Sequence, residues 1–408
     1  MQQDFEKIHK CRLCKSENFI PIINLGNQYL TGRFPSPGQE IASTPLNLIS
    51  CTNCNLLQLE HSYDLSKLYG NFYGYESSLN PWMINHLKEN VKYVSNQSIV
   101  KKSKKILDIG SNDGTTLNFF DKTDLLIGVD PVSLKYKDKY PSDSIIYNDF
   151  FNLNICNEIK KKYFEIDIIT SFAMFYDLED PIDFANNINS ILSDNGLWCL
   201  EQSYLPSMLE KNAFDTICHE HLEYYSLKQI ELIMNSSNLK VIDTKITEAN
   251  GGSFLITVAK KTSNYNESKS VQKLRDFENQ FFSNKNIYSE FYDRVLKIKT
   301  KLKSLINNLN NNNKNVYCLG ASTKGNVILQ YFDLSNKEIK AIGEVNSEKF
   351  GCVTPGTNIP IVNQEEIIND KDGYFIILPW HFKEFFSTSP KFSNLKLIYP
   401  LPEVEILE

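Results

Sequence analysis

Short apolar runs separated by polar segments dominate the middle of the chain. The first five runs lie far enough apart to have a helix between them, which indicates parallel β-α-β units. The last two runs are separated only by residues 248–252, where Asn-Gly-Gly is typical of a hairpin, so this pair should be antiparallel. The strands predicted in this part are 104–110, 125–130, 145–149, 166–172, 197–203, 240–247 and 253–260.

The last third of the chain predicts a second, smaller parallel α/β unit. Residues 265–306 carry apolar side chains at helical intervals, and the Asn-rich run 307–315 predicts a turn or linker. A glycine-bearing loop over 321–326 should then lead into a helix that starts at 327. The strands predicted here are 316–320, 340–345, 374–378 and 396–399.

Composition narrows the class of protein. A length of 408 residues predicts two or three domains, and 41% hydrophobic with 23% charged residues is typical of a soluble globular protein. A net charge of −6 gives no reason to expect nucleic acid as a partner. No apolar run is long enough to span a membrane, and the polar start of the chain does not resemble a signal peptide. We expect a cytoplasmic monomer or small homo-oligomer with no membrane partner.

Four of the nine cysteines form two C-x-x-C pairs, Cys11 with Cys14 and Cys51 with Cys54. Two such pairs commonly present four thiolates to zinc in a tetrahedron. Because thiolates fill all four positions, the predicted zinc site is structural rather than catalytic. A disulfide framework is less expected in a chain with cytosolic character.

A glycine-bearing turn follows the first strand of the middle unit, with the spacing D-x-G-x-N-x-G from Asp108 to Gly114. This spacing differs from the G-x-G-x-x-G of dinucleotide sites and resembles the S-adenosylmethionine loop of the common methyltransferase fold. Asp130, at the end of the next strand, is placed to accept hydrogen bonds from ribose hydroxyls. An ordinary tight turn without a nucleotide is the alternative. The expected cofactor-binding residues are Asp108, Gly110, Ser111, Asn112, Gly114, Asp130, Pro131, Asp149 and Phe150.

A histidine-rich segment, Cys218-His219-Glu220-His221, follows the fifth strand, at the rim where open α/β sheets build their sites. Histidine is suited to proton transfer near neutral pH. The H-E-H spacing would put the two imidazoles on different faces of a helix, so no catalytic metal is expected. A polar helix start with satisfied histidines is the alternative. An earlier aromatic loop, residues 73–78, is expected either to act as a lid or to pack on the core.

The second glycine-bearing turn, Gly320 to Gly325, leaves two interpretations open. Its backbone N–H groups could hold a phosphate, with Ser322 and Lys324 nearby. Alternatively, the glycines only permit close packing of a strand against a helix.

The order of these parts resembles the bacterial sugar C-methyltransferases that act on nucleotide-linked keto-deoxysugars. The resemblance rests on the four cysteines, the segment 108–114, the H-E-H motif, Asn250-Gly251-Gly252-Ser253 and the segment 320–326. It implies an α/β chain of three domains. These are a zinc-binding domain (1–70), a class I, Rossmann-like methyltransferase domain (71–262) and a Rossmann-like substrate-binding domain (263–408).

The resemblance also implies site roles. His221 is the expected base, Glu220 assists it, Tyr75 lines the sugar site and His219 lies beside them. Cys218 replaces a tyrosine that precedes H-E-H in family members with assigned sugar chemistry, and residues 254–256 lack a frequent arginine. Both departures bear on the acceptor. The expected substrate-binding residues are Tyr224, Asn250, Ser253, Ser322, Lys324 and Asn326.

The expected reaction is transfer of a methyl group from S-adenosylmethionine to a carbon next to a ketone, C3 beside a C4 ketone, by His-assisted enolate formation. One alternative is an O- or N-methyltransferase that acts on a sugar or small metabolite. The other is a catalytically inactive, zinc-stabilised binding protein.

Overall fold

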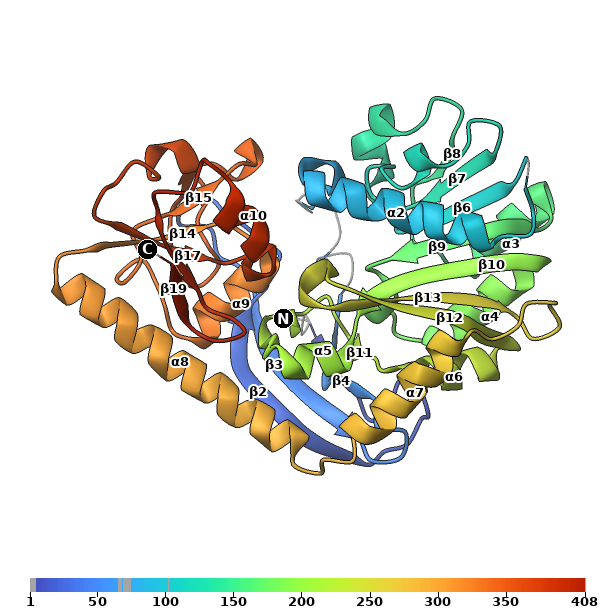
Figure 1. Cartoon of the computed structure of the whole chain (residues 1–408), viewed down its shortest axis with the longest axis horizontal. Helices are drawn as coiled ribbons and strands as arrows, with labels where there is room; N and C mark the ends of the chain where they lie inside the picture. The colour runs from blue at the N-terminus through green and yellow to red at the C-terminus, as the bar shows by residue number, and fades with distance from the viewer. Residues whose placement is uncertain (1–4, 65–67, 69–74, 102, 408) are drawn as a thin grey trace.

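Two lobes make up the molecule, joined at their base by long strands and one long helix (Figure 1). The computed structural model describes residues 5–64, 68, 75–101 and 103–407. The predicted fold class is confirmed: an α/β chain with an N-terminal cysteine cluster, a class I methyltransferase sheet and a C-terminal α/β unit. The first two residues of the aromatic loop, Tyr73 and Gly74, lie outside the described residues.

The N-terminal part forms a four-stranded sheet in the order β11-β4-β3-β2, whose pairs are antiparallel. Its edge strand β11 comes from the middle of the chain and pairs with β4 through Glu223 and Gln58. The sequence patterns did not predict these strands. They are β2 (Phe19–Tyr29), β3 (Ser43–Cys51), β4 (Leu57–Leu59) and β11 (Glu223–Tyr224), with β1 (Phe5–Lys7) and β5 (His61–Tyr63) as a separate antiparallel pair.

The middle unit contains a seven-stranded sheet in the order β12-β13-β10-β9-β6-β7-β8. The five strands from β10 to β8 are parallel, and β13 runs antiparallel to both of its neighbours, as the hairpin signal predicts. Most positions of these strands are buried because helices cover both faces. The strands are β6 (Lys105–Ile109), β7 (Leu125–Val129), β8 (Ile145–Tyr147), β9 (Ile166–Phe172), β10 (Leu192–Ser203), β12 (Leu239–Thr247) and β13 (Ser253–Lys260).

Local sequence sets where the covering helices begin. Asn80 accepts hydrogen bonds from the backbone of the first helical turn, and Pro81 occupies the first helical position, so α2 begins there. Asp180 and Pro181 start α4 in the same way. The helices of this unit are α2 (Pro81–Gln97), α3 (Leu153–Tyr163), α4 (Pro181–Ile191), α5 (Leu205–Glu210) and α6 (Leu227–Ser236).

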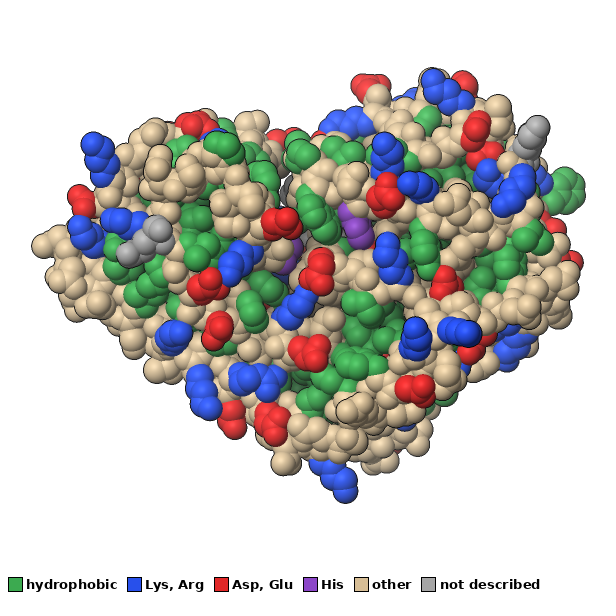
Figure 2. All heavy atoms as spheres, in the orientation of Figure 1, with side chains coloured by type: hydrophobic (Ala, Val, Ile, Leu, Met, Phe, Trp, Pro, Cys, Tyr) green, Lys and Arg blue, Asp and Glu red, His purple; other side chains and the backbone are tan. Residues whose placement is uncertain are grey.

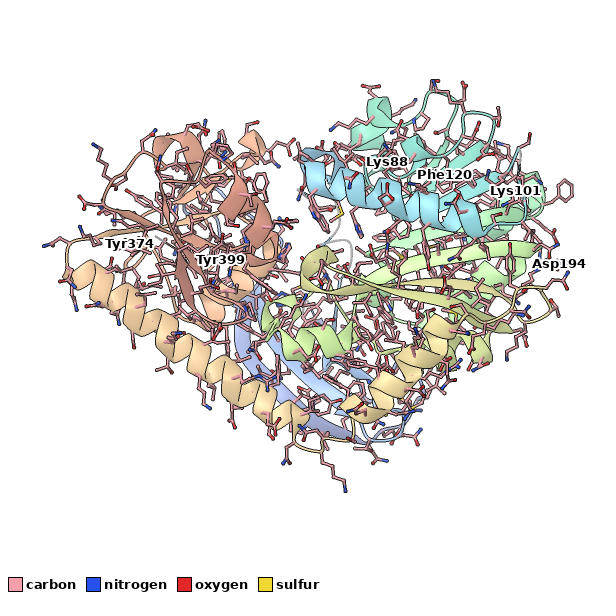
Figure 3. The ribbon with its side chains drawn as sticks, in the orientation of Figure 1. Lys88, Lys101, Phe120, Asp194, Tyr374 and Tyr399 are labelled. Carbon is pink, nitrogen blue, oxygen red and sulfur yellow. The ribbon has the colours of Figure 1, made fainter. Side chains whose placement is uncertain are left out.

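The C-terminal unit contains a six-stranded sheet in the order β16-β15-β14-β17-β18-β19, parallel except for β19. Tyr374 and Tyr399, labelled in Figure 3, lie on β17 and β18 of this sheet. The short strands β16 and β19 were not predicted. The strands are β14 (Asn315–Leu319), β15 (Ile342–Glu344), β16 (Ile361–Asn363), β17 (Gly373–Ile377), β18 (Lys396–Tyr399) and β19 (Glu405–Leu407), and the short helix α10 spans Lys383–Thr388.

Two local predictions for this part of the chain were wrong. The Asn-rich run is not a linker over its full length, because α8 (Ile287–Asn311) continues into it and buries Ile306 and Leu309. The loop predicted over 321–326 is shorter, because Ser322 caps a helix, α9, that begins at Thr323 and ends at Tyr331. The helical pattern of 265–306 is divided between α8 and a separate helix, α7 (Lys269–Phe281).

The predicted domain limits, between residues 70 and 71 and between 262 and 263, stay predictions. α7 packs on β12 of the middle sheet, although the limit was drawn before it at residue 263. α8 runs along the base of the molecule from the middle unit to the C-terminal unit (Figure 1). Of the helices that the structure describes, none combines the length and the apolar character needed to cross a membrane.

Candidate active site and zinc centre

The four cysteines of the paired motifs come together. Their sulfur atoms all lie within 4.8 Å of one another, with Cys11 Sγ 3.6 Å from Cys54 Sγ and Cys14 Sγ 3.5 Å from Cys51 Sγ. A tetrahedral zinc site with Zn–S bonds of about 2.3 Å places its sulfurs about 3.8 Å apart, so the cluster fits zinc. All four donors are thiols, which leaves no position for water or substrate.

Polar contacts hold the zinc cluster to strand β4 and to the middle unit. Gln58 Nε2 donates to Cys11 Sγ over 3.2 Å, which supports a thiolate there. Gln229 Nε2, on α6, donates to the Cys54 carbonyl over 2.9 Å. Arg12 is 3% exposed and binds Glu179 Oε2 from Nε at 3.1 Å. These bonds fix the zinc cluster against the methyltransferase sheet, so it supports structure.

The turn after β6 has the backbone that its glycines and Asn112 predict. Gly110, Asn112 and Gly114 have φ angles of 74°, 48° and 76°, all in the left-handed region. The Asn112 N–H donates to Asp130 Oδ2 over 2.9 Å, and the Val132 N–H donates to Oδ1 over 2.8 Å. The turn after β6 and the carboxylate after β7 are therefore held side by side.

Two buried carboxylates stand in this part of the site. Asp108 accepts from Thr170 Oγ1 over 2.6 Å, while its Oδ2 has no hydrogen-bond partner among the described residues. Burial raises the pKa of Asp108 to about 7 and also raises the pKa of Asp130. A ligand that donates hydrogen bonds or carries positive charge would satisfy these carboxylates, and S-adenosylmethionine has both properties.

A pocket opens at the carboxyl ends of the parallel strands, where sites in such sheets are built. Eight of the nine predicted cofactor residues line it. The ninth, Gly114, does not, and a Cβ at Gly114 would lie 2.7 Å from the ring of Tyr140, so this glycine permits close packing. The residues of the pocket wall used below are Tyr75, Ser77, Asp108, Gly110, Ser111, Asn112, Asp130, Pro131, Asp149, Phe150, Met174, Asp177, Glu201 and Asn250.

The described part of the aromatic loop forms part of the pocket wall beside the glycine-bearing turn. Tyr75 lines the pocket and is 48% exposed. Its carbonyl accepts from Asn112 Nδ2 over 3.1 Å, and the Ser77 N–H donates to Asn112 Oδ1 over 3.1 Å. The Ser78 N–H donates to Asp113 Oδ2 over 2.9 Å. The loop is thus held to the glycine-bearing turn rather than to the interior of the sheet.

His221 lies beside the pocket rather than in its wall. Its ring contacts Tyr176, with 4.1 Å between ring centroids, and Tyr176 adjoins the pocket residue Asp177. His221 Nδ1 lies 2.9 Å from the Thr216 carbonyl oxygen. Since a carbonyl can only accept, Nδ1 carries the proton and Nε2 has the free lone pair of a base. Burial, assisted by the Lys324 cation, lowers the pKa of His221 to about 3.

The other members of the histidine segment point elsewhere. His219 is completely buried and packs edge-on against Tyr63, with ring centroids 4.9 Å apart. Glu220 is buried against Gly32, where a Cβ would lie 2.3 Å from Glu220 Oε1. Burial raises the pKa of Glu220, and the nearby Cys218 thiol opposes that shift. Cys218 and Glu220 are both buried where the middle unit meets the N-terminal part.

Two of the predicted substrate residues meet at the boundary between the lobes. Asn250 lines the pocket, and its carbonyl accepts from Lys324 Nζ over 2.8 Å. Lys324 is the second residue of α9 and therefore comes from the C-terminal unit. Figure 2 shows a hollow where the two lobes meet, with histidine side chains in view there.

The remaining predicted substrate residues have structural contacts. Ser322 accepts from the Gly325 N–H over 3.0 Å as the cap of α9, and Asn326 Nδ2 donates to the Thr31 carbonyl over 2.7 Å. Ser253 donates to the Ala249 carbonyl over 2.9 Å in the hairpin. The buried Tyr224 donates to the Thr216 carbonyl over 3.3 Å. Their substrate contacts stay predictions.

One polar cluster in the pocket was missed by the sequence patterns. Glu201, in the pocket wall, lies with Oε2 2.7 Å from His86 Nε2 and accepts from Asn90 Nδ2 over 3.1 Å. Thr247 donates to its other oxygen over 2.8 Å. The position of Glu201 near the carboxyl end of β10 was the signal that could have found it. His86 and Asn90 face it from α2 and carry no motif.

Comparison with known proteins agrees with this architecture. Residues 11–69 match a zinc binding domain, 80–244 a methyltransferase domain and 248–402 a C-methyltransferase C-terminal domain. The chain is 25% identical over 420 residues to the C-methyltransferase NovU of Streptomyces niveus, covering 100% of this chain and 99% of that protein.

Solved methyltransferase structures resemble part of the chain. One was solved in complex with the Haloferax volcanii Trm112 methyltransferase activator; it shares 15% identity and a TM-score of 0.34, covering 44% of this chain and 92% of that one. The plantazolicin methyltransferase BpumL in complex with SAH shares 12% identity and a TM-score of 0.34, covering 42% of this chain and 84% of that one.

Proposed function

We propose that this chain, which belongs to the S-adenosylmethionine-dependent C-methyltransferases with an N-terminal zinc-binding domain, methylates a carbon next to the ketone of a nucleotide-linked keto-deoxysugar. C3 beside a C4 ketone is the proposed position. S-adenosylmethionine supplies the methyl group on a sulfonium when it is bound. The acceptor carbon must first become a nucleophile, and that step falls to residues of the chain.

The observation that carries the proposal is the hydrogen bond between His221 Nδ1 and the Thr216 carbonyl, 2.9 Å long. It fixes the tautomer in which Nε2 accepts a proton, beside the pocket. A ketone acidifies the hydrogen on the neighbouring carbon, and His221 Nε2 removes that hydrogen as a proton. General-base assistance of this kind is typically worth about 10²–10⁴-fold in rate.

Burial keeps the base in its active form. Because the pKa of His221 is lowered to about 3, its imidazole is neutral throughout the neutral pH range. Transfer to carbon requires such a base, whereas an oxygen or nitrogen acceptor already has a lone pair.

We assign proposed roles to the other site residues from their positions in the structure. Asp130 and the turn from Gly110 to Asn112 hold the methyl donor, and Tyr75 closes the pocket over it. We call the pocket at the carboxyl ends of the parallel strands the donor pocket, because it is the proposed site of the methyl donor. Asn250 and Lys324 lie where this pocket meets the C-terminal unit, and they face the acceptor. Glu220, buried against Gly32 of the N-terminal part, supports the loop that carries His221.

The direct test is incubation of the purified protein with labelled S-adenosylmethionine and a panel of nucleotide-linked sugars. The panel should contain 4-keto deoxysugars, their reduced 4-hydroxy counterparts and the free nucleotides. The proposal expects label on carbon, with a 4-keto compound only. Label on oxygen or nitrogen would contradict it and support the alternative acceptor class. Binding of the methyl donor without transfer to any member would support the inactive, binding-protein alternative.

A further inference from the structure

We propose that Lys324 is a catalytic residue whose ammonium group donates a hydrogen bond to the ketone oxygen of the acceptor and stabilises the enolate that forms when His221 removes the proton. The inference rests on the proposed function, because it assigns a role in the same step. It differs from both sequence interpretations of this turn, which were a phosphate held on backbone N–H groups with Ser322 and Lys324 nearby, and glycines that only permit close packing.

The position of Lys324 is fixed by one bond across the boundary between the lobes. Its Nζ donates to the Asn250 carbonyl over 2.8 Å, and Asn250 lines the donor pocket. Asn250 has a φ of 55°, a left-handed conformation that turns the hairpin toward α9. Within the described residues this is the one hydrogen bond of the ammonium, so two of its three N–H groups remain for a ligand.

A buried carboxylate stands near this ammonium, on the short helix that α9 packs against. Asp215, on the short helix Phe214–Thr216, is completely buried, and its charge opposes the effect of burial, which lowers the pKa of Lys324. Asp215 Oδ2 accepts from Trp380 Nε1 over 2.8 Å, so the carboxylate is itself held. The other titratable groups that face the lysine are Cys218, His221 and His381.

The backbone places this cation next to the proposed base. Asp215 is followed directly by Thr216, whose carbonyl accepts the Nδ1 proton of His221. The helix α9, which carries Lys324, packs against this short helix, and the Lys324 cation contributes to the lowered pKa of the His221 imidazole. A substrate between them would meet a base on one side and a hydrogen-bond donor on the other.

The chemistry of the step needs both groups. The proton on the acceptor carbon moves to His221 Nε2, and the C–H electron pair becomes the C=C bond. The π pair of the ketone moves onto oxygen, where negative charge develops. An imidazole with a lowered pKa is a weak base, so the proton must be made more acidic. A preorganised donor at the developing oxyanion has this effect and is typically worth about 10²–10³-fold in rate.

The test measures exchange of the hydrogen next to the ketone, in deuterated water and without a reactive methyl donor. Parent, Lys324→Met, Lys324→Arg and Lys301→Met proteins are compared with the keto-sugar nucleotide that the parent methylates. Lys301 is the matched control, since its Nζ also donates to a backbone carbonyl, that of Val404, at 2.9 Å. The expected result is a loss of about 10²–10³-fold for Lys324→Met, partial recovery with Lys324→Arg and no loss for Lys301→Met.

The pH dependence of the exchange rate distinguishes a catalytic role of Lys324 from a merely structural one. Removing the Lys324 cation should raise the pKa of His221. The pH below which the exchange rate falls should therefore be higher in Lys324→Met than in the parent. An unchanged exchange rate, or a lower rate whose pH dependence is that of the parent, would overturn the inference. A raised KM with unchanged exchange at saturation would assign the lysine to phosphate binding and would also overturn it. A parent protein without exchange or methyl transfer would instead reject the proposed function.

Discussion

The backbone N–H of Asn112 donates to Asp130 Oδ2 over 2.9 Å, and this bond ties the turn after β6 to the end of β7. The same carboxylate also accepts from the Val132 N–H. Asp130 therefore shapes the backbone of the pocket, and in the proposed function its remaining lone pairs accept hydrogen bonds from the methyl donor. Both functions depend on the same two oxygens.

Asp130→Ala should weaken S-adenosylmethionine binding by roughly 1–3 kcal/mol, the range expected when charge-assisted hydrogen bonds are lost. Titration calorimetry is the measurement. Asp194→Ala is the control, because Asp194 is an exposed acid at the far end of the middle unit, labelled in Figure 3. Equal affinities of the Asp130 variant and the parent would remove Asp130 from the site.

His221→Asn should retain the affinity for the methyl donor and lose most of the turnover, about 10²–10⁴-fold. His219→Asn should affect turnover less, because His219 packs against Tyr63 in the interior. Deuterium exchange next to the ketone distinguishes the two, since it reports proton removal alone. Equal exchange in the parent and the His221 variant would place the base elsewhere, with Glu220 and Tyr224 as the next candidates.

His219 should make the protein sensitive to acid. Burial lowers its pKa from 6.5 to about 4, so between these values the unfolded chain binds a proton that the folded chain does not. The stability it contributes is complete above pH 6.5 and is lost as the pH falls toward 4, by about 3 kcal/mol in total. Denaturant unfolding of the parent and of His219→Gln at several pH values checks this. The difference between the two free energies of unfolding should change with pH in that window, and a constant difference would contradict the assignment.

The protein should contain about one zinc ion per chain when it is purified without added metal. Elemental analysis measures this directly. Cys11→Ser should lower the zinc content and the stability of the N-terminal sheet, because Cys11 is a buried member of the cluster. Cys352→Ser is a suitable control, since this cysteine lies in the C-terminal unit outside the cluster. A zinc-free parent would contradict the assignment.

Strand prediction succeeded in the middle unit for a physical reason. Parallel strands covered on both faces are nearly continuous apolar runs, as in the segment Leu125 to Val129, and such runs are visible in the sequence. β2 was missed because much of it is exposed or half-buried and it contains Pro21 and Gly26. The extension of α8 was missed because the burial of Ile306 and Leu309 outweighs the low helix propensity of the asparagines around them.

Sequence motifs predicted one part of the candidate site and missed another. Local motifs indicated the two C-x-x-C pairs and the turn from Asp108 to Asn112, since the residues of each motif are close in sequence. The cluster of Glu201 with His86 and Asn90 could not be found, because α2 and β10 are brought together only by the fold. Spacing also could not reveal that His219 faces the interior, since that depends on which residue of the loop meets the N-terminal sheet.

The edge strand β11 has a consequence for how the chain acquires its structure during synthesis. The N-terminal sheet receives its last strand from Glu223–Tyr224, more than 150 residues after β4 in the chain. A ribosome must therefore complete most of the methyltransferase unit before that edge can be covered. Until then, the nascent zinc-binding segment exposes an unpaired strand edge. The strand that closes the edge begins two residues after His221, so the same short segment completes the N-terminal sheet and carries the proposed base.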